Sequence, residues 1–165
     1  MFREMRRKGQ QMSAEAGSAV LERGTSGVLA LAGDDGYPYA VPLSYVYHNG
    51  KLYFHSAATG HKLDAIARCD KASFCVIDKD EIVPEAYTTY FRSVIAFGRV
   101  RVIEDEAQKL GAIRALADRY NREATYERRE AEISGALKRL CMIEMTIEHM
   151  TGKEAIELVK AHKEG

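Results

Sequence analysis

The hydrophobic pattern of the chain changes from helical to β-type near residue 26. Before that point, Ser13 is a suitable N-cap for a short helix, which Gly24 ends. From residue 26 onward Val, Leu and Tyr fill the apolar positions, and turn sequences at 34–36 (DDG) and 48–50 (HNG) interrupt them. This spacing predicts three consecutive antiparallel strands.

Strand and helix patterns continue to alternate in the middle of the chain. A helical pattern begins at Gly60, and residues 71–78 (KASFCVID) return to strand character. Residues 87–105 form a long β-type segment that contains Gly98. A glycine inside a strand indicates a bulge or a bend, so we expect one at this position.

The last third of the chain combines helices with one further strand. A helical region is predicted over 105–138, with Asp105 as its first cap. Residues 139–152 alternate apolar and acidic positions and predict the last strand, and residues 153–165 predict a C-terminal helix. Together with a basic arm at 1–12, these elements predict a single domain of mainly β (α+β) class with flanking helices.

Composition and charge argue against several classes of protein. The chain has 24 Lys and Arg against 24 Asp and Glu, so it carries no net positive charge that would favour nucleic acid. No apolar run reaches the length of a signal peptide core or a membrane span, and the three cysteines lack CxxC spacing. We therefore expect a cytoplasmic protein that neither spans a membrane nor binds nucleic acid.

The segment HSAATGHK, residues 55–62, is the sharpest candidate for binding chemistry. A strand ends near Ser56, and a helix begins near Gly60 with His61 and Lys62 in its first turn. Free N–H groups at a helix start bind anions, whereas a cation there is unfavourable unless an anion compensates it. Lys62 therefore indicates a phosphate site. The alternative is that Lys62 is an ordinary solvated lysine.

Pro42 lies inside an otherwise strong strand pattern. Proline cannot donate a hydrogen bond to a strand ladder, so residue 42 should lie where its strand has no neighbour on that side. In a barrel, a ligand could approach the backbone at such a place.

Motifs of other enzyme classes are missing from the sequence. The five histidines form no HxxxH or HExxH pair, so no metal site is expected. There is no Ser-His-Asp order, P-loop or GxGxxG motif either. Hydrolase, kinase and Rossmann functions are therefore unsupported.

Three sequence blocks together resemble one family of flavoproteins. The blocks are GYPYAVPLSY (36–45), FHSAATGHK (54–62) and FRSVIAFG (91–98), and the chain opens with FREMRRKGQ (2–10). In order and spacing they resemble the pyridoxamine 5'-phosphate oxidase-like split barrels, specifically the nitroimidazole-resistance (Nim) branch. The resemblance implies a six-stranded antiparallel Greek-key split barrel, which forms a homodimer with two FMN molecules in grooves between the subunits.

The same resemblance assigns cofactor contacts to residues of all three blocks. The strand 39–44 would offer backbone groups to the edge of the flavin ring, and residues 55–57 would lie beside the ribityl chain and phosphate. Residues 61–62 would grip the phosphate, and residues 92–93 would reach the flavin from the other subunit. The implied cofactor-binding set is Tyr39, Ala40, Val41, Pro42, Leu43, Ser44, His55, Ser56, Ala57, His61, Lys62, Arg92 and Ser93.

The function that the resemblance implies is an FMN-dependent oxidoreductase. A small planar acceptor such as a 5-nitroimidazole would receive electrons that NADH or NADPH supplies, and His55 or Arg92 is the candidate for stabilising reduced flavin. The pyridoxamine oxidases carry arginine and lysine where this chain has Tyr39 and Ser44, so vitamin B6 oxidation is not expected. The alternative function is a non-catalytic flavin- or haem-binding module.

Overall fold

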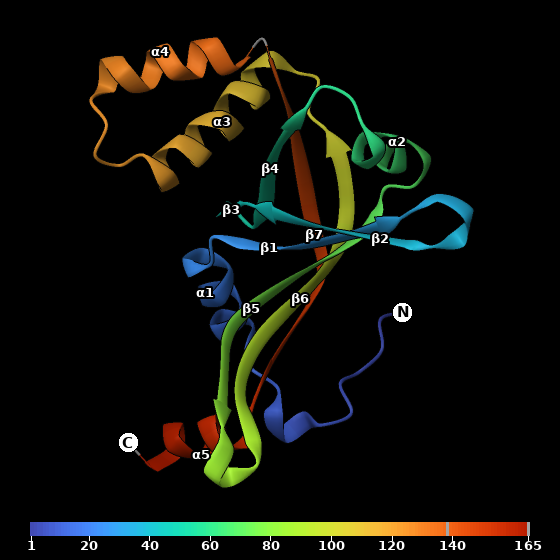
Figure 1. Cartoon of the computed structure of the whole chain (residues 1–165), viewed down its shortest axis with the longest axis vertical. Coiled ribbons are helices and arrows are strands. Elements are labelled where there is room, and N and C mark those ends of the chain that lie inside the picture. The colour runs from blue at the N-terminus through green and yellow to red at the C-terminus, as the bar shows by residue number, and fades with distance from the viewer. Residues whose placement is uncertain (138, 165) are drawn as a thin grey trace.

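The computed structural model describes residues 1–137 and 139–164, which form one antiparallel sheet with helices around it (Figure 1). The fold is therefore of the predicted α+β class. The strands are β1 (Ser26–Ala32), β2 (Pro38–Ser44), β3 (Val46–His48), β4 (Lys51–Ala57), β5 (Lys71–Val83), β6 (Thr88–Val102) and β7 (Leu140–Glu154). The helices are α1 (Ala14–Arg23), α2 (His61–Arg68), α3 (Glu106–Tyr120), α4 (Tyr126–Leu137) and α5 (Ile156–Glu164).

The strand count differs from the prediction. Among the described residues the sheet has seven strands, in the order β2-β1-β5-β6-β7-β4-β3, where six were expected. The additional strand arises because the predicted second strand is divided at Tyr45 into β2 and β3. These two strands lie at opposite ends of the sheet although one residue separates them. The sheet therefore curls, and the chain at Tyr45 connects its two ends. No hydrogen-bond ladder pairs β2 with β3 among the described residues.

The burial of Tyr45 explains this division. Successive side chains of a strand point to opposite faces, so a strand with one exposed face alternates between more and less buried residues. Tyr45 is fully buried and Val46 nearly so, which ends the regular alternation of β2. The Tyr45 hydroxyl donates a 2.8 Å hydrogen bond to the Leu21 carbonyl, and the Tyr45 amide donates one of 3.3 Å to the Thr25 carbonyl. These bonds fasten the bend to the end of α1.

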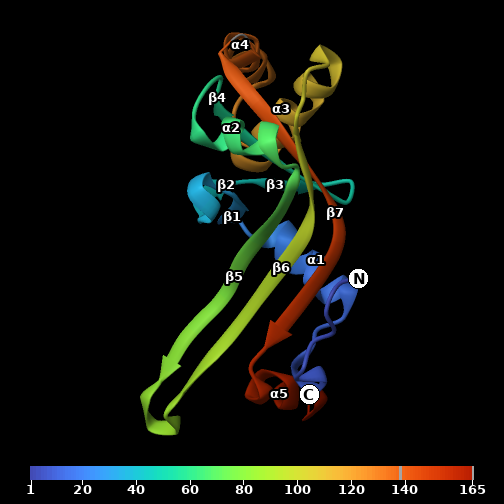
Figure 2. The same cartoon turned by 90° about the vertical axis from the view of Figure 1, so that its right-hand side faces the viewer.

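β5 and β6 form a long hairpin that extends away from the curled part of the sheet (Figure 2). The predicted strand 71–78 is longer than expected, since β5 continues to Val83. The pairing register shifts at Asp78, the one residue left unpaired between Ile77 and Lys79. A bulge of this kind redirects a side chain, and it turns the Asp78 carboxylate toward Arg23 of α1.

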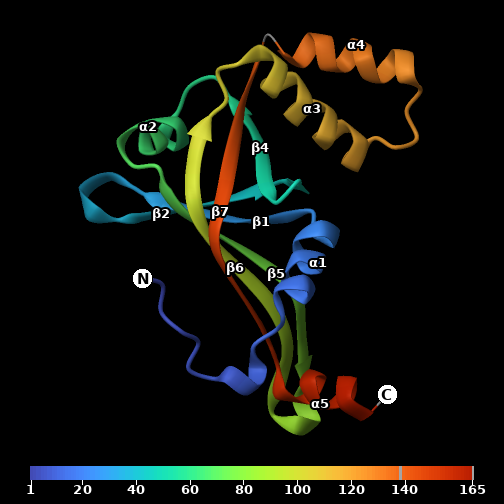
Figure 3. The same ribbon diagram turned by 180° about the vertical axis from the view of Figure 1, so that it is seen from behind.

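Two hydrophobic clusters stabilise the fold. The larger one lies between the curled sheet and the helices α1 and α2, and Leu29, Phe54 and Phe74 are fully buried in it. The smaller one lies under α3 and α4, where Ile113 and Ile133 meet other apolar side chains. Figure 3 shows α3 and α4 together at the end of the molecule opposite α5. The helical pair thus has its own apolar contact with the sheet.

Several local predictions are confirmed. Ser13 accepts a 3.1 Å hydrogen bond from the Ala16 amide at the start of α1, and Asp105 accepts one of 2.8 Å from the Gln108 amide at the start of α3. Gly98 lies at a register shift between β6 and β7. The boundaries of the last elements differ from the expected ones, because β7 runs on to Glu154 and α5 begins at Ile156.

Candidate functional site

The predicted phosphate site lies where β4 ends and α2 begins. Gly60 is the N-cap of α2, with a φ of 132° that favours glycine, and no side chain caps the helix. The amides of residues 63 and 64 donate to the Gly60 carbonyl, while those of His61 and Lys62 make no such backbone bond among the described residues. The Lys62 side chain is half-buried and forms no ion pair with a described residue. An anion at this helix start would therefore find free donors and a free cation.

His61 is held by the neighbouring β1–β2 turn. Its Nε2 lies 3.2 Å from a carboxylate oxygen of Asp34, and its ring stacks on Tyr39 with 4.1 Å between the ring centroids. Asp34 also accepts a 2.6 Å hydrogen bond from Arg68 near the end of α2. These contacts bring the start of β2 next to the start of α2. His61 was predicted to grip a phosphate, and it is the less available of the two basic residues there.

The residues of β4 are divided between its two faces. Ser56 is buried on the inner face, whereas His55 and Ala57 are exposed on the outer face. Ser56 pairs with Cys141 of β7. Burial raises the pKa of the Cys141 thiol, and the positive charges of Lys109 and Lys62 oppose that rise. Lys62 is thus close to the Ser56–Cys141 pair, and His55 is on the other side of the strand.

β2 is an edge strand, as Pro42 predicted. It pairs only with β1 among the described strands, so the other edge of its backbone is open. Its predicted flavin-contact residues also alternate between two faces. Tyr39, Val41 and Leu43 pack against the larger cluster, whereas Ala40, Pro42 and Ser44 are exposed.

A cavity of about 360 Å³ lies between the helical pair and the sheet, at the end of β2 and beside β4. Ser44 and His55 line it on the side of the sheet, so two predicted cofactor residues share one space. Its remaining lining residues come mainly from α3, α4 and the start of β7: Ile113, Leu116, Ala117, Tyr120, Asn121, Glu132, Ile133, Ala136, Leu140 and Met142.

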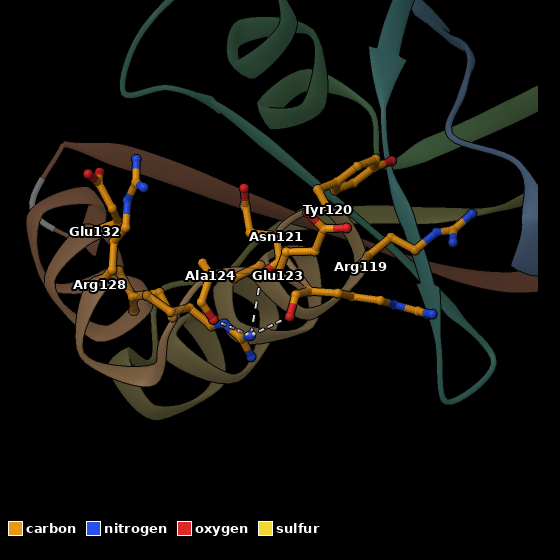
Figure 4. Close-up of a pocket in the computed structure, with 11 residues that line it drawn as sticks. Arg119, Tyr120, Asn121, Glu123, Ala124, Arg128 and Glu132 are labelled. Carbon is orange, nitrogen blue, oxygen red and sulfur yellow. Dashed lines mark hydrogen bonds between the residues drawn. The ribbon is translucent and has the colours of Figure 1, made fainter.

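A wider and more polar cavity of about 760 Å³ adjoins the first one at the α3–α4 loop (Figure 4). Arginine and glutamate side chains, among them Arg128 and Glu132, surround it. Arg129 secures the loop, since it donates 2.6 Å to Asp118 and also contacts the carbonyls of residues 121, 122 and 124. Five lining residues belong to both cavities: Ala117, Tyr120, Asn121, Glu132 and Ile133.

Comparison with known proteins identifies the family. A family model described as pyridoxamine 5'-phosphate oxidase matches residues 13–154. The chain belongs to this family. No curated protein sequence matches the chain significantly.

Several solved structures share the fold. A conserved hypothetical protein of Mycobacterium tuberculosis has a TM-score of 0.79 at 18% identity, with 92% of this chain and 90% of that chain covered. A protein described as a 5-nitroimidazole antibiotic resistance protein of Bacteroides thetaiotaomicron has a TM-score of 0.73 at 21% identity, with 87% and 86% covered. An FAD-binding protein of Mesorhizobium loti has a TM-score of 0.62 at 26% identity, with 88% and 97% covered.

Within this family fold, Arg92 is engaged by carboxylates of its own chain. Its Nε donates 2.9 Å to Glu154, and its NH1 donates 3.2 Å to Asp78. Hydrogen bonds from Arg23 hold the pKa of Asp78 below its usual range, and Arg92 adds to that effect. Arg92 lines a different cavity from the one that contains His55. The single chain therefore does not bring Arg92 together with His55 or Lys62.

Asp78→Asn should destabilise the protein by about 1 to 3 kcal/mol at pH 7, because charged hydrogen bonds to two arginines are lost. Because folding lowers the pKa of Asp78, its carboxylate stabilises the folded protein fully at pH values above the ordinary aspartate pKa of about 3.9. This stabilisation is lost as the pH falls through the folded-state pKa of Asp78. Urea unfolding at pH 7 and at pH 3 should show a difference that shrinks in acid. Asp80→Asn, at an exposed position without an ion pair among the described residues, is the control. Equal effects of both variants at pH 7 would contradict this role of Asp78.

The helical wall of the cavity was not part of the sequence prediction of the site. A signal for it was present, since α3 carries Ile113 and Leu116 on one apolar face. That pattern predicts packing against a sheet, yet it contains nothing to indicate a cavity beside His55. Among the described residues no group of three or more His, Cys, Asp or Glu side chains could hold a metal ion, and no described helix is long and apolar enough to cross a membrane.

Proposed function

We propose that this chain is an FMN-dependent oxidoreductase that works as a homodimer. The observation that carries the proposal is the uncapped start of α2, where Lys62 has no ion-pair partner among the described residues. It lies next to an open edge strand, as a cofactor with a phosphate tail and a flat ring requires. The FAD-binding protein of Mesorhizobium loti, which has the same fold, supports a flavin as the cofactor.

The residues at the site fit FMN. One lysine and one helix start match a single phosphate monoester, which carries up to two negative charges. Ser56 lies close to this position and could donate its hydroxyl hydrogen, while Ala57 leaves room on the outer face. The ring would lie along β2, whose open edge gives access to the backbone of residues 39–44. FAD, with its diphosphate and adenosine, would need further contacts beyond Lys62.

The homodimer is supported by an uncovered, largely apolar sheet face. Val28, Cys75 and Ile95 are register partners across β1, β5 and β6, and Val28 and Ile95 remain more than a third exposed. Ile77 lies on the same face and is 68% exposed. Exposed apolar patches of this kind mark interaction surfaces. A second copy of the chain would cover this face and complete the flavin groove.

Ser93 lies on this apolar face next to Ile77, so it is suitably placed to reach the flavin of the partner. Arg92 points to the opposite face, where Asp78 and Glu154 neutralise it. We therefore favour His55 over Arg92 as the group that stabilises reduced flavin. His55 is exposed and makes no side-chain hydrogen bond with another described residue, so its imidazole is available to donate one.

The flavin, when bound, would supply hydride or electron transfer. The chain's residues would orient it, and His55 would donate a hydrogen bond where negative charge develops. NADH or NADPH is the proposed reductant, and a small planar nitro compound is the proposed acceptor. The similarity to the protein described as a 5-nitroimidazole resistance protein supports that acceptor. The three cysteines are free, which suits the reducing cytoplasm that we propose as the location.

Purified protein should carry a yellow chromophore whose mass is that of FMN. NADH or NADPH should bleach its absorption, and a 5-nitroimidazole should restore it in the absence of oxygen. Yellow protein that neither nucleotide bleaches would instead indicate a flavin-binding module without turnover. A haem spectrum, or protein that stays colourless after incubation with FMN, would refute the proposal.

A further inference from the structure

The cavity beside His55 combines a mainly apolar wall with polar side chains from the sheet and from the helices. Ile113, Ile133 and Met142 belong to the smaller hydrophobic cluster, and each has part of its surface on the cavity. Such walls favour a ligand whose surface is mostly apolar, since each buried apolar area is removed from water. The volume of about 360 Å³ suits a molecule of one or two rings.

Polar side chains line the cavity on both sides, with Ser44 and His55 on the side of the sheet and Asn121 and Glu132 on the side of the helices. His55 and Ser44 line the cavity without side-chain hydrogen bonds to described residues. Tyr120 is already engaged, because its hydroxyl lies 2.7 Å from the Thr25 carbonyl and 2.5 Å from the Tyr45 carbonyl. This contact anchors the end of α3 to the bend between β2 and β3. The helical roof is therefore fixed at that end, and an acceptor atom of the ligand could take a hydrogen bond from His55 on the opposite side.

We propose that this cavity binds a small, mostly apolar ring compound with one hydrogen-bond acceptor facing His55, and that α3 and α4 set the size of that compound. The inference rests on the proposed function, because the compound would then lie next to a flavin ring placed along β2. The wider cavity shares five lining residues with this one, so longer substituents can extend toward Arg128 at the outer end.

Ala136 is the residue that tests the size limit. It is half-buried on α4 and lines the apolar cavity, so Ala136→Leu would fill part of the space with three additional carbon atoms. Ala131 lies on the same helix, is exposed and lines neither of the two cavities, which makes Ala131→Leu a matched control. Leu116→Ala is the opposite change, since it enlarges the cavity from the α3 side.

Equilibrium dialysis of nitrobenzene against the flavin-loaded protein is the measurement. Ala136→Leu should raise the Kd about tenfold, as overpacking opposes the ligand, while Ala131→Leu should leave it unchanged. Leu116→Ala should improve the binding of 1-nitronaphthalene relative to nitrobenzene. Circular dichroism melting of each variant confirms that it is folded.

Equal Kd values for wild type, Ala136→Leu and Ala131→Leu would overturn the inference. Absence of nitrobenzene binding to wild type would also overturn it, including the case in which a partner copy fills the cavity. The flavin content of the same samples is measured separately and reports on the proposed function. A variant with full flavin and no nitrobenzene binding therefore distinguishes the two proposals.

Discussion

Lys62→Ala should lose FMN far more readily than the wild-type protein. A charge-assisted hydrogen bond to phosphate contributes about 1.5 to 3 kcal/mol, which corresponds to a rise in Kd of about tenfold to a hundredfold. The effect should be this large because no carboxylate of a described residue pairs with Lys62. Fluorescence titration of flavin-free protein with FMN gives the Kd directly.

Two further variants separate the charge from other effects at residue 62. Lys62→Arg should retain most of the affinity, because a guanidinium also binds phosphate. Lys160→Ala, an exposed lysine on α5, should leave the Kd unchanged. Riboflavin lacks the phosphate, so it should bind more weakly than FMN. Its Kd should be the same for the wild-type protein and for Lys62→Ala. An unchanged Kd for FMN in Lys62→Ala would remove this residue from the site.

Gly98→Ala should destabilise the protein by about 2 to 4 kcal/mol. A Cβ at Gly98 would collide with the backbone of Thr146 on β7, well inside van der Waals contact. Backbone atoms within a ladder cannot rotate away as a side chain can, so β6 and β7 would have to separate locally. Those two strands are paired over most of their length, and the disturbance would reach the sheet beneath α3 and α4.

Gly111→Ala is the matched control for Gly98→Ala. Gly111 lies within α3, and nothing lies within 4 Å of an added Cβ there. Because alanine favours the helix, this change should stabilise the protein by about 0.5 to 1 kcal/mol. Thermal and urea unfolding monitored by circular dichroism compare the two variants. A loss below about 1 kcal/mol for Gly98→Ala would show that the strands part easily at the bulge.

The sequence predicted most elements of the fold because their signals are local. Ser13 and Asp105 are side-chain caps, and the bulge at Gly98 needs only a residue without a Cβ. The division at Tyr45 was not foreseen, since it depends on a carbonyl of Leu21 that lies 24 residues away. Strand propensity alone continues through Tyr45, and only tertiary burial ends the strand there.

For the same reason, the sequence indicated only the local features of the candidate site. The helix start at Lys62 is a local pattern, and the structure places it beside β2. The partners of His61 and Arg92 come from distant segments, namely Asp34 and the carboxylates of Asp78 and Glu154. Pairing of charges across a fold leaves no trace in the spacing of residues. The cofactor residues that depend on a second subunit remain a prediction.

The bend at Tyr45 also limits how far apart the neighbouring ends of β2 and β3 can lie. Ser44 and Val46 are two residues apart, so their Cα atoms cannot be separated by more than about 7 Å. Next to that point β2 and β4 are tethered, whereas their far ends, toward residues 39 and 57, have no such covalent limit. The short link at Tyr45 therefore fixes the separation of the strands at this end of the sheet. In the proposed complex the flavin ring would lie toward this linked end of β2, and the phosphate would lie toward the start of α2.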